Sequence, residues 1–455
     1  MGSEWPTVKF GEVLLNGARN GIYKKKELHG SGIKIVNMGE LFAYPRLRSV
    51  PMKRVEVTAK ELERASLQPG DLLFARRSLV AEGAGKCSIV LEVDEPTTFE
   101  SSIIRCRPDP RKAHSLYLYY FFNSPQGRYL LGTIRRQVAV AGITGRDLVQ
   151  LEIPLPPLAQ QRAIAHILGT LDDKIELLRR MNETLEAMAR ALFKSWFVDF
   201  DPVIDNALEA GNPIPDELKG KAKRRLALGE RRKPLPEHIR RLFPDRFVDS
   251  ELGPIPDGWK IRSLDEIAEY LNGVAWQKYR AKEGEPSLPV IKIRELREGI
   301  TSASDRASMH VPEEYIVEDG DVLFSWSGSL LVKIWCGGKG VLNQHLFKVS
   351  SKHYPKWFYY LWTSEHLGRF QRIAADKATT MGHIKRSHLS ESYVLVPNST
   401  LLGKMTAIIE PLIENQIANE IACRTLANIR DTLLPKLISG EIGVSDAEKF
   451  VKEAL

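Results

Sequence analysis

The segment EGAGKCS, Glu82–Ser88, is similar to a phosphate-binding loop. That loop needs a glycine five residues before its Gly-Lys pair, and Val80 occupies the position. The sequence contains no GxSxG, HExxH, GxGxxG or paired-cysteine motif, and it lacks the glycine-rich loop and Asn/Asp-Pro-Pro-aromatic motif of adenine methyltransferases. His383 and His388 stand five residues apart without a third candidate ligand. We therefore expect no catalytic residue, no metal site and no bound cofactor in this chain.

Basic and hydrogen-bonding side chains gather at turns beside short apolar runs. Arg76 and Arg77 follow a Gly-Asp turn, and Ser325–Ser327 hold the matching place later in the chain. Arginine pairs with two acceptors of guanine, and serine can contact base edges. The alternative to base contact is that these side chains contact phosphates or lie in a solvated loop. The predicted DNA-binding residues are Lys24, Lys25, Lys26, Arg76, Arg77, Ser101, Ser102, Arg135, Arg136, Thr144, Arg146, Gln277, Lys278, Tyr279, Arg280, Ser325, Trp326, Ser327, Lys333, Gln344, His345, His383, Lys385 and Arg386.

The chain has 455 residues and a formal net charge of +8. Residues 1–157 hold 23 Lys and Arg against 16 Asp and Glu, and residues 259–398 hold 19 against 16. The positive excess therefore lies in two blocks that we expect to face phosphates, although chance unevenness would give the same count. Four scattered cysteines and the absence of a long apolar run or an N-terminal leader predict a cytoplasmic protein with reduced thiols.

The chain repeats itself in five paired blocks, followed by a sixth pair of helical segments. The clearest pairs are QPGDLLFARRS with VEDGDVLFSWS, SLYLYYFFNSPQGRY with PKWFYYLWTSEHLGRF, and AGITGRDL with MGHIKRSHL. The members keep the same order, about 240 to 254 residues apart along the sequence. This order predicts a tandem duplication of one module and one long helix.

Each module is expected to be α+β. Its short β-branched runs predict strands, and its Gly-Asp turns precede apolar strands. The aromatic segments Ser115–Tyr129 and Pro355–Phe370 are too apolar for a surface helix, so we interpret them as core helices, with an aromatic binding platform as the alternative. We assign 1–157 and 259–398 to the two globular modules, 158–199 and 399–438 to the long helices, 200–258 to a connector rich in Pro and basic residues, and 439–455 to a tail.

The segment from Leu158 to Trp196 carries apolar residues at alternating spacings of three and four, which is the period of a coiled coil. Asn182 falls on this seam, where one polar residue costs stability and fixes register. Pro435 is expected to end or kink the second helix. The two helices are expected to pack as an antiparallel coiled coil through Leu168, Leu171, Ile175, Leu178, Asn182, Leu185, Leu192, Leu412, Ile417, Ile421, Leu426 and Leu433.

Three stretches resemble the specificity subunit of Type I restriction–modification systems. They are Ile153–Pro202, which contains the motifs PPLAQQRAIA and KSWFVDF, the second-module opening GPIPDGW at Gly253–Trp259, and RDTLLPKLISGEI at Arg430–Ile442. The likeness covers essentially the whole chain. One departure is that the second helix begins with VPNSTLLGKM instead of a Pro-Pro-Leu-x-x-Gln entry, which puts in doubt its first-turn contacts with other subunits.

The resemblance implies a non-catalytic subunit that reads an asymmetric, bipartite DNA site with one recognition domain for each half. The paired helices would set the spacing and dock two modification methyltransferase subunits. Those subunits would bring S-adenosylmethionine, and a restriction subunit would bring ATP and Mg²⁺ chemistry. The alternatives are a DNA-binding scaffold outside restriction–modification and a catalytic protein with a decayed motif.

Overall fold

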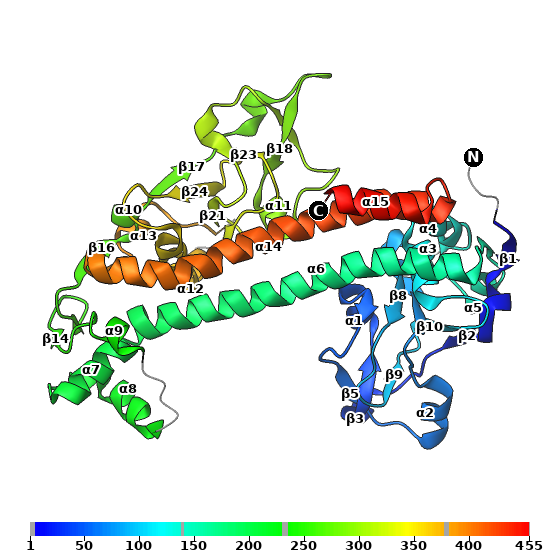
Figure 1. Cartoon of the computed structure of the whole chain (residues 1–455), viewed down its shortest axis with the longest axis horizontal. Coiled ribbons are helices and arrows are strands. Elements are labelled where there is room, and N and C mark those ends of the chain that lie inside the picture. The colour runs from blue at the N-terminus through cyan, green and yellow to red at the C-terminus, as the bar shows by residue number, and fades with distance from the viewer. Residues whose placement is uncertain (1–4, 138–140, 230–234, 377–381, 455) are drawn as a thin grey trace. The chain divides into compact units, whose positions relative to one another are not determined.

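The computed structural model describes residues 5–137, 141–229, 235–376 and 382–454 (Figure 1). Met381, the first residue of the repeated MGHIKRSHL segment, lies outside the described residues. The chain divides into two compact units. Unit 1 comprises residues 1–175 and 425–455, and unit 2 comprises residues 176–424. Each unit therefore contains one module and one part of each long helix, α6 (Leu158–Phe193) and α14 (Ser399–Ser439).

Unit 1 holds thirteen described strands and five helices of the first module, together with a C-terminal helix. The strands are β1 (Thr7–Lys9), β2 (Leu14–Asn20), β3 (His29–Val36), β4 (Arg46–Leu47), β5 (Lys53–Val55), β6 (Leu72–Ala75), β7 (Arg77–Ser78), β8 (Cys87–Val90), β9 (Thr97–Phe99), β10 (Ile103–Pro108), β11 (Arg136–Gln137), β12 (Ala141–Gly142) and β13 (Glu152–Pro154). The helices are α1 (Met38–Ala43), α2 (Ala59–Ala65), α3 (Ser115–Asn123), α4 (Pro125–Thr133), α5 (Gly145–Val149) and α15 (Val444–Ala454).

The largest sheet of the first module has the order β2-β10-β6-β8-β4. Smaller sheets have the orders β5-β3-β9 and β11-β12-β7, and β1 pairs with β13. The core lies between the main sheet and the aromatic helix α3, where the rings of Phe10, Phe74 and Phe122 meet edge to face at 4.8 to 6.1 Å. The prediction that Ser115–Tyr129 belongs to the core is confirmed for Tyr117–Phe122, which are buried.

Unit 2 holds the second module and the connector that precedes it. The strands are β14 (Phe247–Val248), β15 (Ile255–Pro256), β16 (Lys260–Ser263), β17 (Glu269–Asn272), β18 (Ser287–Ile291), β19 (Arg306–Ser308), β20 (Ile316–Val317), β21 (Val322–Ser325), β22 (Val332–Ile334), β23 (Gly340–Leu342), β24 (Leu346–Ser350) and β25 (Tyr393–Val396). The helices are α7 (Asp201–Ala210), α8 (Asp216–Ala227), α9 (Glu237–Arg240), α10 (Leu264–Ile267), α11 (Ile293–Glu298), α12 (Lys356–Asp376) and α13 (Ser387–Ser390).

The two modules repeat one topology. The sheet β17-β24-β21-β22 has the order of β2-β10-β6-β8, and β16 pairs with β25 as β1 pairs with β13. Parallel pairs occur at the same place in each copy, β3 with β9 and β18 with β23. The Gly-Asp turns also match, because Gly70 and Gly320 have φ values of +93° and +92°. The predicted tandem α+β fold is confirmed.

The long helices run antiparallel within each unit (Figure 1). In unit 2, Asn182 of α6 donates from Nδ2 to the Gln416 carbonyl oxygen at 3.1 Å. Its Oδ1 accepts from Asn419 at 2.9 Å. In unit 1, Arg430 of α14 forms an ion pair of 2.6 Å with Asp172 of α6. The seam position predicted for Asn182 is therefore confirmed.

The stripe predicted on α14 is only partly correct. The buried residues in its first half are Leu401, Met405, Ile409, Ile413 and Ile417, whereas Leu412 and Ile421 are half-buried, as are Leu185 and Leu192 on α6. The physical reason is that this half of α14 also packs on the second module, where Trp357 of α12 donates to Thr406 at 3.0 Å. A helix with two neighbours has a wider apolar face than a two-helix seam. Pro435 does not end α14, which continues to Ser439.

The connector, residues 200–258, contains the short helices α7 to α9, and several of its apolar side chains are buried in the second module. Helix α6 passes through a π-helical turn at Lys194–Val198, and Phe200 adopts a left-handed φ of +57° before α7 begins. Trp196 and Phe197 are 1% exposed, and they join Val203 and Phe243 in the core cluster of the second module. The second module therefore includes the end of α6 and the connector.

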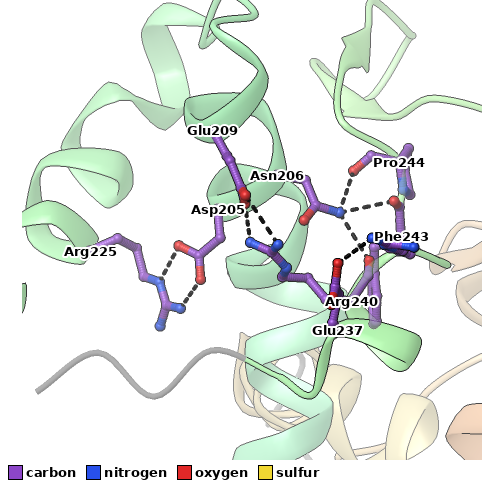
Figure 2. Close-up of polar contacts among 9 residues, drawn as sticks. Asp205, Asn206, Glu209, Arg225, Glu237, Arg240, Phe243 and Pro244 are labelled. Carbon is purple, nitrogen blue, oxygen red and sulfur yellow. Dashed lines mark hydrogen bonds and ion pairs between the residues drawn. The ribbon is translucent and has the colours of Figure 1, made fainter. Parts of the chain in front are cut away.

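Buried polar contacts hold the connector helices together (Figure 2). Asp205 of α7 is 3% exposed and accepts two hydrogen bonds from Arg225 of α8. The Asn206 side chain donates to the carbonyl oxygens of Arg240 and Phe243, both at 3.0 Å, at the end of α9. Such contacts fix short helices that could not persist alone.

Within the described residues, every helix is too short or too polar to cross a membrane.

Candidate nucleic-acid interface

Four chain segments of the first module meet at one edge of its main sheet. The backbone of Ile22 bridges to Glu100, which brings the loop after β2 beside Ser101 and Ser102. The Arg76 amide donates to the Ser102 carbonyl oxygen at 2.8 Å, and the Ile143 amide donates to the Arg76 carbonyl oxygen at 3.0 Å. The structure thus brings together Lys24–Lys26, Arg76–Arg77, Ser101–Ser102 and Thr144–Arg146, which are far apart in the sequence.

Several of these side chains are available for a ligand. Lys25, Lys26, Arg77 and Arg146 are exposed, and Arg76 is half-buried with its guanidinium 3.4 Å from the Ser101 carbonyl oxygen. Arg136 of β11 lies beside them, because β11 pairs with β12 and β12 pairs with β7. This edge is therefore positively charged and rich in arginine.

Other predicted contacts in the first module have structural partners. Lys24 forms an ion pair of 2.8 Å with Glu61, and this bond lowers the pKa of Glu61 to about 2. The Thr144 hydroxyl accepts from the Asp147 amide at 3.2 Å and so caps α5. Lys24 and Thr144 therefore have structural roles as well, and their contact with DNA stays a prediction. Arg136 pairs with Asp147 at 2.8 Å but stays 67% exposed, and Arg135 is half-buried.

The second module builds the same edge from different side chains. The Gln344 amide donates to the Val274 carbonyl oxygen at 3.0 Å, and the Ile384 amide donates to the Trp326 carbonyl oxygen at 3.0 Å. The backbones of Ser327 and His383 form a bridge. The predicted segments around Trp326, Gln344, His383 and Lys385 therefore meet, as their counterparts do in the first module.

Aromatic and imidazole rings dominate this second surface. The ring of Trp326 lies 5.8 Å from that of His345 and 6.3 Å from that of His383, measured between ring centroids. Ser327 Oγ lies 3.0 Å from His345 Nδ1, and Trp326 Nε1 donates to Asn272 at 2.9 Å. Asn272 was missed in the sequence, where nothing distinguishes it from an ordinary strand-end residue. The arrangement offers stacking rings and hydrogen-bonding edges at the positions that match Arg76 and Arg77 of the first module.

The structure buries two of the residues predicted to contact DNA in the second module and gives two others contacts within the module. Ser325 and Ser327 are 0% and 3% exposed, and the Ser325 hydroxyl donates to the Ser329 carbonyl oxygen at 2.7 Å to hold the turn. Lys333 lies on β22 and donates to the Leu296 carbonyl oxygen at 3.3 Å. Tyr279 is half-buried against the apolar cluster around Val290. Burial removes Ser325 and Ser327 from a ligand, whereas Lys333 is exposed and Tyr279 is half-buried, so DNA contact by these two stays a prediction.

The remaining predicted residues are accessible. Gln277, Lys278, Arg280, His383 and Lys385 are exposed. Arg386 is also exposed, but one guanidinium nitrogen donates to the Tyr270 carbonyl oxygen at 3.0 Å. His388 Nδ1 accepts from the Lys385 amide at 3.1 Å, so His388 supports the loop. Among the described residues, no group of three or more His, Cys, Asp or Glu side chains could hold a metal ion.

Two surfaces of one topology, one with Arg76 and Arg77 and the other with Trp326 and His345 beside its own basic residues, define a protein with two recognition modules. The sequence model of the Type I restriction modification DNA specificity domain matches residues 2–187 and 256–422, and the chain belongs to this family. The two matched regions agree with the tandem duplication.

Named relatives and a solved structure agree with this assignment. The chain is 24% identical to the Type I restriction enzyme MjaIX specificity subunit of Methanocaldococcus jannaschii over 97% of this chain and 94% of the relative. It is 25% identical to the HindI specificity subunit of Haemophilus influenzae over 66% of this chain and 71% of the relative. The crystal structure of an S subunit from M. genitalium has the same fold, with a TM-score of 0.55 at 15% identity over 95% of this chain and 96% of that one. The predicted identification as a specificity subunit is confirmed.

Proposed function

We propose that this specificity subunit reads an asymmetric, bipartite DNA site, with one half-site for each module. The observation that carries the proposal is that equivalent loops meet at equivalent sheet edges but present Arg76 and Arg77 in one copy and Trp326 and His345 in the other. Because the two modules share a backbone topology but differ in the side chains of their loops, we expect each module to recognise a different half-site. Arginine suits the paired acceptors of guanine, whereas imidazole and amide groups suit mixed donor and acceptor edges.

The long helices would set the distance between the half-sites. Helix α6 has 36 residues, which corresponds to roughly 54 Å at about 1.5 Å per residue. Two DNA readers about one helical turn apart, roughly 34–36 Å, face the same side of a duplex. A helix of this length is sufficient for that separation.

The partners follow from the same proposal. Two modification methyltransferase subunits would dock on the helices, and a restriction subunit would complete the assembly in the cytoplasm. S-adenosylmethionine, ATP and Mg²⁺ would bind those partners. The chain itself would contribute DNA contacts and geometry.

The test is DNA-site selection with the full chain bound to the methyltransferase encoded beside it. Sequencing of the retained or methylated DNA is expected to give two short motifs separated by a gap of fixed length. A single contiguous motif, or retention that depends only on salt, would contradict the proposal.

A DNA-binding scaffold outside restriction–modification is the second candidate. The elongated pairing of α6 and α14 in each unit would serve that role equally well. Co-purification separates the two candidates. A stable complex with the neighbouring methyltransferase supports a restriction–modification subunit, and failure to form one at micromolar concentration favours the scaffold.

A further inference from the structure

Two adjacent apolar side chains project from a loop of the first module. Leu79 is 92% exposed, which is the largest value for any large hydrophobic residue in the described part of the chain, and Val80 is 63% exposed. We refer to Leu79 and Val80 as the apolar tip. Isolated exposed leucines are common, but two branched side chains together at a loop end beside arginines point to a ligand.

The loop holds the apolar tip in a defined position. The Val80 amide donates to the Ser78 hydroxyl at 3.2 Å, and the Val80 carbonyl oxygen accepts from the Gly83 amide at 3.0 Å. The base of the loop is closed by the Gly85 amide, which donates to the Ala75 carbonyl oxygen at 2.8 Å. A Cβ atom on Gly83 would lie 2.3 Å from Ser78 Oγ, so the turn excludes larger residues there. The exposure of the tip is therefore a property of an ordered turn.

The charges around the apolar tip identify the kind of surface that it meets. Arg77 is exposed on the same strand, and Arg136 reaches the same small sheet through β12 and is 67% exposed. Glu82 is the only carboxylate among residues 76–86. A membrane surface would need a larger apolar area than two side chains, whereas two exposed arginines on the adjoining small sheet suit a DNA duplex.

The chemistry of the bases indicates which group of the duplex the apolar tip contacts. Phosphates and the polar base edges offer nothing favourable to a leucine. The thymine 5-methyl group is the apolar feature of the major groove, and small apolar side chains are its usual partners. Leu79 follows the exposed Arg77 by two residues, so an arginine that contacts the duplex would bring the apolar tip close to a base edge.

The second module lacks this feature. Its corresponding turn carries Gly328 and Ser329, which are exposed, and the next residue, Leu330, is 6% exposed. The apolar tip therefore distinguishes the two copies, as a residue that reads one half-site would.

We propose that Leu79, assisted by Val80, reads the 5-methyl group of a thymine in the half-site of the first module. This inference rests on the proposed function and names a specificity-determining contact within it. Arg77 contacts a neighbouring position of the same half-site, and Leu79 discriminates the thymine.

The experiment uses the full chain in complex with its methyltransferase and the site found by selection. Each thymine of that site, on either strand, is replaced in turn by deoxyuridine, which lacks only the 5-methyl group. At one thymine of the first half-site, or at two neighbouring ones, the wild-type complex is expected to lose about fourfold in affinity, as expected for one buried methyl group. Leu79→Ala is expected to bind the thymine and deoxyuridine sites equally.

Two controls accompany the measurement. Leu226→Ala removes an exposed leucine of the connector, 58% exposed, and should keep the wild-type dependence on the methyl group. Replacing thymines of the second half-site by deoxyuridine should change the affinity of the Leu79→Ala complex and of the wild-type complex by the same factor.

Three results would overturn the inference and leave the proposed function intact. They are a first half-site without thymine, a Leu79→Ala complex that keeps the full methyl dependence, and loss of methyltransferase binding in Leu79→Ala with unchanged base preference. The absence of any split motif would instead refute the proposed function.

Discussion

Arg430 of α14 donates to Asp172 of α6 across 2.6 Å, and the two residues are 258 positions apart in the chain. Tyr120 of α3 donates to the other oxygen of the same carboxylate at 2.7 Å. Burial opposes the charge of Arg430, but the Asp172 carboxylate raises the pKa of the guanidinium above its ordinary value. One buried acid thus joins both long helices to the core of the first module.

The first prediction concerns this buried acid. Asp172→Ala removes the acceptor of the Tyr120 hydroxyl and leaves Arg430 with the exposed Asp431 as its ion-pair partner, and we expect a loss of about 2 kcal/mol in the free energy of unfolding. Asp216→Ala is the matched control, because Asp216 is 84% exposed and its ion pair with Lys219 is screened by solvent and contributes little. Urea denaturation measures both variants. Equal losses would show that Asp172 does not join these elements.

A second prediction follows from acid titration of the first module. Lys24 lowers the pKa of Glu61 from 4.5 to about 2, and Lys34 and Arg111 lower those of Asp94 and Asp109 from 3.8 to about 2. A lowered folded-state pKa stabilises the native protein above the unfolded value. This stabilisation is lost as the pH falls from about 4.5 to about 2.

Urea midpoints measured at successive pH values test this window. The midpoint should fall across it, and Glu61→Gln should show a smaller fall because one of the three groups is gone. A wild-type midpoint that stays constant down to pH 2 would contradict the prediction.

The fold was predictable from the sequence where repeats and periodicity agree. The duplication, the aromatic core helices and the seam position of Asn182 were predicted from repeats and from the spacing of apolar residues, and the packing in the structure agrees with these patterns. The burial of the connector was not predicted, because its charge and proline content are typical of a surface segment. Phe200, Val203 and Phe243 are buried by partners that are distant in the sequence. The stripe of α14 was misplaced for a similar reason, since periodicity does not reveal a second neighbour.

The site was predictable as a set of loops but less so as individual side chains. Matching positions in two copies located the segments that meet at each sheet edge. Whether Ser325 faces outward or supports its turn depends on hydrogen bonds that no motif encodes. Leu79 was overlooked because apolar residues were assigned to the core by type.

The third prediction separates the two reading surfaces. Arg77→Ala removes an exposed guanidinium of the first module, and we expect about a tenfold or greater loss of discrimination at one position of one half-site. Trp326→Ala should damage the other half-site alone, because its contacts with His345 lie in the second module. Selection with each variant complex measures both. Equal damage to both half-sites by either variant would contradict the assignment.

The fourth prediction concerns the connector. Arg225→Ala removes the guanidinium that donates two hydrogen bonds to Asp205, which is 3% exposed, and we expect a loss of about 2 kcal/mol in stability. The double variant Asp205→Ala, Arg225→Ala should recover part of this loss, because the buried charge is also removed. Thermal unfolding compares the two. A double variant less stable than Arg225→Ala would mean that the pair acts through packing alone.

The last prediction concerns the length of the helix pair. Asn182 of α6 faces Gln416 and Asn419 of α14, so a deletion must remove one heptad from each helix to keep these partners in register. Removing seven residues shortens each helix by roughly 10.5 Å, about 3 base pairs at ~3.4 Å each. We expect the selected spacer to shorten by about that number while both half-site sequences stay the same. Deleting the heptad from α6 alone should instead misalign the Asn182 contacts and lower stability. An unchanged spacer in a stable double deletion would show that the helices do not set the distance.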